Sequence, residues 1–161
     1  MGDSLYDRLA ATAKAHIDGM RPKTPGTNQD NADALLANCA PTFRMSWGPA
    51  YYISTTPNLQ GERTGEEFAA HLRLMAPAFQ KWAIDITNMC VDVKTRTAVV
   101  RADFHMVPRG GEEVVQDLIL WMVMDESGEK VVRCTEFVDA AATVELGVRL
   151  KAGTGRDLVN E

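Results

Sequence analysis

Three ionisable side chains recur at alternate positions of one apolar stretch, residues 98–107, which reads AVVRADFHMV. Such alternation predicts a β-strand, in which successive side chains point to opposite faces. Arg101, Asp103 and His105 therefore share one face. The neighbouring candidate strands, residues 82–90 and 114–124, are too apolar for an open, wet sheet. We therefore expect this polar row to project into a covered cavity, where ligand sites form, rather than into water.

The spacing of Asp103 and His105 suits proton transfer. Side chains two residues apart on a strand lie side by side, so the carboxylate would orient the imidazole or act as the base itself. Burial would raise the pKa of this carboxylate toward neutrality. The alternative is a structural ion pair between Arg101 and Asp103, and the sequence leaves both interpretations open.

Three further ionisable residues are candidates for the same site. Glu136 lies in an apolar strand, where an unpaired buried carboxylate is costly, and we predict a general acid or base, with an interface salt bridge as the alternative. Arg44 alternates with apolar residues, and if it points inward it would steady a developing oxyanion. His71 lies beside the apolar stripe of a helix that would roof the cavity, whereas His16 is expected at the surface.

Aromatic and methionine side chains would supply the apolar wall of such a cavity, because they offer large and adaptable contact area. The candidates for substrate binding are Trp47, Tyr51, Tyr52, Phe68, His71, Met75 and Trp121. No glycine-rich phosphate loop, zinc-protease motif or nucleophile elbow occurs. Three scattered histidines and three scattered cysteines lack metal-ligand spacing, so we expect neither a metal nor a cofactor.

The elements that would position these residues follow from changes of hydrophobic period along the chain. Capping-box patterns predict two helices, one that begins at Leu5 and one that follows Thr64 and ends near Pro77. From Trp82 onward the period becomes two, which predicts a meander of strands. Further helices are expected at residues 30–38 and 139–152, and strands at 42–47, 82–92, 97–107, 113–124 and 131–138, with an aromatic loop over 48–63.

Length and composition indicate one soluble domain, residues 1–161, with 45% hydrophobic and 24% charged residues. A net charge of −5 without a basic cluster argues against nucleic acid as the partner. No apolar run reaches membrane-spanning length, and the N-terminus lacks the apolar core of a signal peptide. Three cysteines, odd in number and far apart, fit reduced, buried thiols, so we expect a cytoplasmic protein.

The segment 118–124, LILWMVM, is apolar on both faces of its predicted strand. One face would line the cavity, and the few helices of this chain leave the other face uncovered. We therefore expect the outer face of the sheet to pack against a second copy in a homodimer.

The order of the elements and several short phrases resemble a known family. The helix over residues 9–20 and the sequences CAPTFRMSW, LMAPAFQKW and KVVRCTEFVDAA are similar to those of SnoaL-like proteins. These belong to the nuclear-transport-factor-like superfamily, and the likeness is greatest to small fungal isomerases and cyclases of polyketide, xanthone and meroterpenoid biosynthesis. The resemblance covers residues 5–152. It implies an α+β fold in which a conical, curved antiparallel sheet packs on N-terminal helices and encloses a pocket.

The resemblance also implies cofactor-free acid–base chemistry on a hydrophobic polycyclic substrate, as in an isomerase or cyclase. Asp103 and His105 would take or relay a proton next to a carbonyl, Glu136 would return it, and Arg44 would hold the oxyanion. Which group is the acid and which the base stays open, and a dehydratase or hydrolase would use the same groups. Because the fold also hosts non-enzymes, a ligand-binding or dimerisation module is the second hypothesis; a cavity plugged by Trp121 or Phe104 would favour it.

Overall fold

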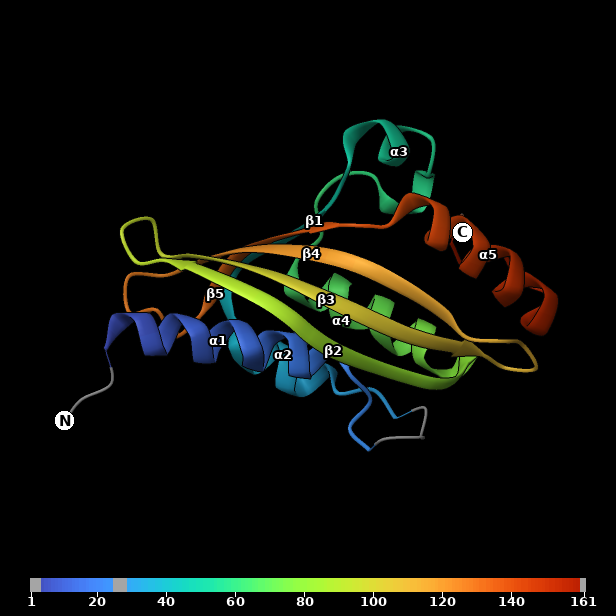
Figure 1. Ribbon diagram of the computed structural model, residues 1–161, viewed down its shortest axis with the longest axis horizontal. Coiled ribbons are helices and arrows are strands. Elements are labelled where there is room, and N and C mark those ends of the chain that lie inside the picture. The colour runs from blue at the N-terminus through green and yellow to red at the C-terminus, as the bar shows by residue number, and fades with distance from the viewer. Residues whose placement is uncertain (1–3, 25–28, 160–161) are drawn as a thin grey trace.

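A computed structural model describes residues 4–24 and 29–159 of the chain and places helices against one curved sheet (Figure 1). The helices are α1 (Leu5–Met20), α2 (Ala32–Asn38), α3 (Ala50–Ser54), α4 (Gly65–Met75) and α5 (Ala140–Thr154), and the 3₁₀ turns are η1 (Pro57–Leu59) and η2 (Ala76–Ala78). The strands are β1 (Cys39–Gly48), β2 (Phe79–Asp92), β3 (Thr97–Pro108), β4 (Val114–Met124) and β5 (Val131–Phe137).

The sheet has the strand order β1-β5-β4-β3-β2. Strands β2 to β5 form the antiparallel meander that the period-two pattern predicts, whereas the edge strand β1 runs parallel to β5. The predicted α+β class, a curved sheet packed on helices, is confirmed. The parallel edge is a refinement, and it brings the end of β1 beside the end of β5.

The helix starts obey the local chemistry read from the sequence. In α4 the Thr64 hydroxyl accepts a hydrogen bond from the Glu67 N–H at 3.2 Å, while the Glu67 carboxylate accepts from the Thr64 N–H at 2.7 Å. The same reciprocal capping box begins α1 at Ser4. Asp139 caps α5 by accepting from the Ala142 N–H, so the C-terminal helix is confirmed. The short helix α3 was not predicted, because its region was expected to be a loop.

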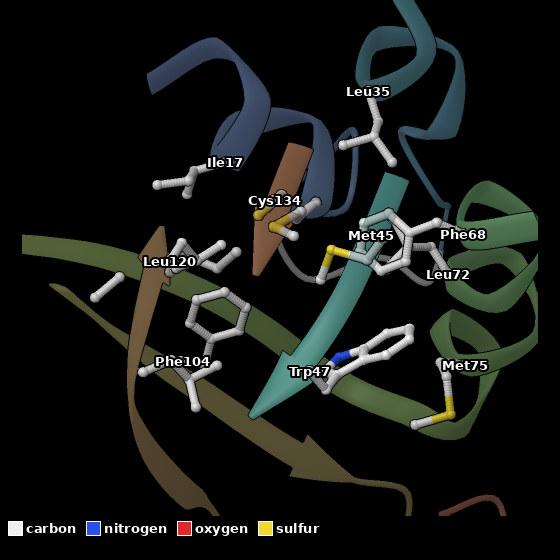
Figure 2. Close-up of a cluster of buried hydrophobic side chains, with 14 of the residues drawn as sticks. Ile17, Leu35, Met45, Trp47, Phe68, Leu72, Met75, Phe104, Leu120 and Cys134 are labelled. Carbon is white, nitrogen blue, oxygen red and sulfur yellow. The ribbon is translucent and has the colours of Figure 1, made fainter. Parts of the chain in front are cut away.

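The core lies between the inner face of the sheet and the helices. Helix α1 packs along β2 and β3, α2 lies against α1 and α4, α4 packs on β1, and α5 covers one end of β3 and β4 (Figure 1). Figure 2 shows Met45 and Trp47 of β1 facing the side of α4 that carries Phe68, Leu72 and Met75. The inward side chains of β3 and β4 are all buried: Ala98, Val100, Ala102, Phe104, Met106, Val114, Gln116, Leu118, Leu120, Met122 and Met124.

The three cysteines are free thiols. Cys134 is buried in the core, as expected, whereas Cys90 is exposed on β2, so the prediction of buried thiols is wrong there. Among the helices of residues 4–24 and 29–159, none is long and apolar enough to cross a membrane.

Helix α1 and helix α2 approach each other at Gly19, which tests this packing. A Cβ atom at Gly19 would lie 2.6 Å from the Leu35 backbone, so Gly19→Ala forces the helices apart. Helix propensity alone predicts that this substitution adds about 1 kcal/mol of stability. We expect the opposite, a net loss of at least about 1 kcal/mol in urea unfolding, because overpacking against backbone dominates.

A matched control sits on the exposed side of the same helix at Ala11. Ala11→Gly should cost about 1 kcal/mol by propensity alone. A Gly19→Ala protein more stable than the wild type would contradict the α1–α2 contact.

Candidate active site

A cavity of about 100 Å³ lies between the inner face of the sheet, α4, α5 and the last described residues of the chain. Most of its wall is apolar and comes from elements far apart in the sequence, including Phe68, Leu72, Met75, Phe104, Met106, Leu118 and Leu146. Five polar side chains interrupt this wall: Asn58, His71, Gln116, Glu136 and Thr143. Such a site, mostly apolar with a few convergent polar groups, is the usual arrangement of a small-molecule pocket.

Glu136 is the ionisable acid of this cavity. The register pairs Glu136 with Trp47 of β1 on one side and with Leu120 of β4 on the other. Burial among these neighbours raises the pKa of Glu136 to about 7, and a hydrogen bond from the Trp47 side chain opposes part of that rise. At neutral pH the carboxyl group is therefore present as acid and as carboxylate in similar amounts, so it can give or take a proton.

His71 faces the same space from α4. Its ring meets the Trp47 ring edge-on, with centroids 6.1 Å apart, and stacks at 6.4 Å on Phe68. Burial, with a smaller contribution from the positive charge of Arg63, lowers the pKa of His71 to about 4. The imidazole is therefore neutral near pH 7 and acts there as a hydrogen-bonding group rather than as a cation.

Arg63 places a positive charge behind the aromatic wall. Its guanidinium lies 4.9 Å from the centre of the Trp47 ring, within the range of a cation–π interaction. The guanidinium also donates to the Asn58 carbonyl and, at 2.9 Å, to Asn58 Oδ1. Paired backbone hydrogen bonds of 2.8 Å with Met45 anchor the residue. Arg63 is therefore a structural support for Trp47.

The structure brings together five of the residues predicted for the site. Glu136, Trp47, Phe68, His71 and Met75 line the cavity. Tyr52 does not, but it lines a neighbouring groove between α3 and α5.

The prediction that Asp103 and His105 face the cavity is wrong. Both lie on the outer face of β3, since the cavity is lined from this strand by Phe104 and Met106. The His105 imidazole lies between two carboxylates, with Nε2 3.4 Å from Asp85 and Nδ1 3.6 Å from Glu113. The strand turns its apolar side chains inward because their burial against the helices is favourable, whereas burial of the charged side chains would be costly. The charged side chains therefore stay hydrated.

Three other predicted residues also lie outside the cavity. Arg44 points away from the side of β1 that carries Met45 and Trp47, and it donates to the Phe43 carbonyl at 2.7 Å. Tyr51 is 85% exposed on α3, and Trp121 is 50% exposed on the outer face of β4. The expected position of His16 is wrong as well: it is fully buried beside Phe43, and burial lowers its pKa to about 4.

Sequence reasoning missed three polar residues of the cavity, Asn58, Thr143 and Gln116, and of these Gln116 is the one on a strand. It is 5% exposed and shares the inward side of β4 with Val114 and Leu118. The signal was present, because a lone polar residue among apolar residues of one parity is the pattern that identified Glu136. Among residues 4–24 and 29–159, no group of three or more His, Cys, Asp or Glu side chains is arranged to hold a metal ion.

No family model matches the sequence, and a search of curated proteins finds no match. Solved structures do match. The BvnE pinacolase from Penicillium brevicompactum is 14% identical with a TM-score of 0.76, covering 94% of this chain and 97% of its own. PrhC from Penicillium brasilianum is 18% identical with a TM-score of 0.76, covering 96% of each chain. A protein from Jannaschia described as a SnoaL-like polyketide cyclase is 16% identical with a TM-score of 0.65, covering 89% of this chain and 94% of its own.

At these identities the comparisons show a common architecture rather than a common reaction. The matches extend over 89–96% of this chain, so the correspondence covers both the sheet and the helices packed on it. The chain therefore has the α+β fold of the SnoaL-like, nuclear-transport-factor-like proteins.

Proposed function

We propose that this protein is a cofactor-independent isomerase or cyclase that moves a proton within an apolar polycyclic molecule, such as a polyketide or meroterpenoid intermediate. The observation that carries the proposal is Glu136, a carboxyl group with a pKa of about 7 in a mostly apolar cavity. A pKa near the working pH is what general acid–base catalysis requires. The fold shared with a pinacolase and a polyketide cyclase is consistent with this chemistry.

The geometry suggests a division of roles. Glu136 as carboxylate takes a proton from a carbon next to a carbonyl, and the electron pair moves onto the carbonyl oxygen. Neutral His71 and the Gln116 amide line the same cavity and serve as donors to that oxygen. Protonated Glu136 then returns the proton to another carbon or to oxygen, which completes the isomerisation without loss of atoms. Dehydration or hydrolysis would begin from the same groups.

One observation favours the alternative, a non-catalytic ligand-binding module. The cavity is small, about 100 Å³, and Phe104 forms part of its wall, although Trp121 does not enter it. Proton exchange at a bound ketone separates the two functions, because a binding module would hold the ketone without accelerating exchange.

We also propose that two copies pair through the outer face of the sheet. Val115, Ile119, Trp121 and Phe137 are each at least 40% exposed there, on the adjacent strands β4 and β5. Exposed aromatic and aliphatic side chains in one patch are typical of a protein interface.

The catalytic assignment predicts different outcomes for substitution of Glu136, which lines the cavity, and of Asp103 and His105, which lie on the outer face of β3. Deuterium exchange from D₂O into 2-tetralone, a bicyclic ketone with acidic protons, reports abstraction without knowledge of the natural substrate. We expect Glu136→Gln to slow enzyme-catalysed exchange by about 10²- to 10⁴-fold, as removal of a general base does. Asp103→Asn and His105→Ala should retain it. NMR measures the rates, and full activity of Glu136→Gln would refute the assignment.

The raised pKa of Glu136 also predicts how stability depends on pH. The folded protein binds this proton more tightly than the unfolded chain, whose carboxyl keeps the ordinary pKa of 4.5. The contribution of Glu136 to stability is therefore present at low pH and is lost as pH rises from 4.5 through about 7.

Chemical denaturation at pH 5 and pH 8 measures this loss. Relative to Glu136→Gln, the wild type should lose about 2 kcal/mol over that interval. Both proteins contain the buried histidines His16 and His71, so the contribution of these residues to the pH dependence of stability cancels in the comparison. An unchanged difference between the two proteins would mean that the carboxyl group is solvated.

The outer-face pairing predicts a change of assembly state. Trp121→Glu should convert a dimer to a monomer, or raise its dissociation constant at least tenfold, because it puts a charge in the apolar patch. Sedimentation equilibrium measures the constant. Val93→Glu, at a residue 40% exposed near the β2–β3 turn, is the control with the same charge change. A monomeric wild type would disprove the pairing.

A further inference from the structure

Three hollows meet around the C-terminal segment, which we define as residues 156–159. The first is the cavity of about 100 Å³ described above. The second is a groove of about 330 Å³ between α3 and α5, the α3–α5 groove, and the third is a hollow of about 250 Å³ along α4, the α4 groove. Val159 lines both the cavity and the α3–α5 groove, and Leu158 lines both the cavity and the α4 groove. The C-terminal segment is therefore a partition between them.

This partition is made by side chains docked into the core. Helix α5 ends at Gly155, whose positive φ of 73° turns the chain at the helix end. Leu158 and Val159 are then 5% and 9% exposed, within the main hydrophobic cluster. Asn58 Nδ2 donates to the Leu158 carbonyl at 3.3 Å.

Helix α5 is adapted to this docking at Gly147. Glycine inside a helix costs about 1 kcal/mol relative to alanine, so its presence calls for a local reason. A Cβ atom at Gly147 would lie 3.1 Å from Val159 Cγ2 and 3.4 Å from Val159 Cβ. The missing side chain thus provides the seat for Val159.

The size of the Glu136 cavity does not suit a polycyclic ligand. Pockets for ligands of that class span roughly 300–1,000 Å³, and this cavity has about 100 Å³. The cavity and the α3–α5 groove together reach that range. The C-terminal segment belongs to no helix or strand, so it can move away without breaking an element of the fold.

We propose that the ligand site extends from the Glu136 cavity into the α3–α5 groove, and that a polycyclic apolar ligand binds by displacing Leu158 and Val159. The inference rests on the proposed function, which supplies the polycyclic ligand. It adds that the C-terminal segment sets the upper size limit for molecules that reach Glu136. A one-ring compound fits beside the docked segment, whereas a four-ring compound requires its release.

A disulfide between positions 147 and 159 tests this directly. The distance of 3.4 Å between the two Cβ positions is close to that of natural disulfides. The double variant Gly147→Cys/Val159→Cys is made in a Cys90→Ser background, because Cys90 is exposed. Oxidation locks the segment and reduction frees it, so one protein provides both the test and its matched control.

Two probes of different size are titrated into both forms. Pyrene, an apolar four-ring fluorophore, is followed by energy transfer from tryptophan, and toluene is followed by NMR. We expect oxidation to weaken pyrene binding at least tenfold and to leave toluene binding unchanged. Equal pyrene affinity in both forms would overturn the inference while leaving the proposed function standing. No pyrene binding in the wild type or in either form would overturn both.

A second variant does not depend on disulfide formation. Leu158→Ala/Val159→Ala weakens the docking, so it should bind pyrene at least threefold more tightly than the wild type. Val93→Ala, far from the three hollows, should bind as the wild type does. Unchanged or weaker pyrene binding by the double alanine variant would contradict the displacement.

Discussion

The central constraint in this structure is that a curved sheet with few helices can bury only one of its two faces. Strands β3 and β4 alternate strictly, so the choice of which face turns inward assigns every side chain at once. The face that carries Ala102, Phe104 and Leu118 is the one buried against α1 and α5. The charged row with Arg101, Asp103 and Asp117 is left in water. All chemistry inside the molecule must therefore come from the rare polar residues of the inward set.

Glu136 is the most consequential of these exceptions. A carboxyl group among apolar neighbours is costly, and the cost appears as a pKa near 7. Trp47 donates to it, Arg63 lies over the Trp47 ring, and paired backbone bonds with Met45 hold Arg63 in place. Glu136 is thus held by Trp47 of the edge strand β1, and Trp47 is in turn supported by Arg63 from the loop before α4. That arrangement orients the carboxyl group without neutralising it by an ion pair.

The site also depends on the C-terminal segment, residues 156–159, which follows α5. The segment that contains Leu158 and Val159 lines the cavity with side chains that belong to no strand or helix. Its docking uses Gly147, a position whose cost in helix stability is explained by the fit of Val159. Side-chain packing of this kind can be undone locally without unfolding the sheet, which is what the proposed displacement by a ligand requires.

The sequence by itself determined the strands of the meander, the capped helices and the polar exceptions on apolar faces, since these follow from local periodicity and capping. The α+β fold was what the resemblance implied. Glu136 on its strand and His71 beside the apolar stripe of its helix were found from periodicity, and the same rule applied to β4 would have found Gln116. Only the tertiary structure decided which face of β3 is covered, and it placed Asp103 and His105 outside. It also decided that His16 is buried and that Val159 lines the cavity. Periodicity divides a strand into two faces, but the direction of each face depends on contacts between residues distant in the chain.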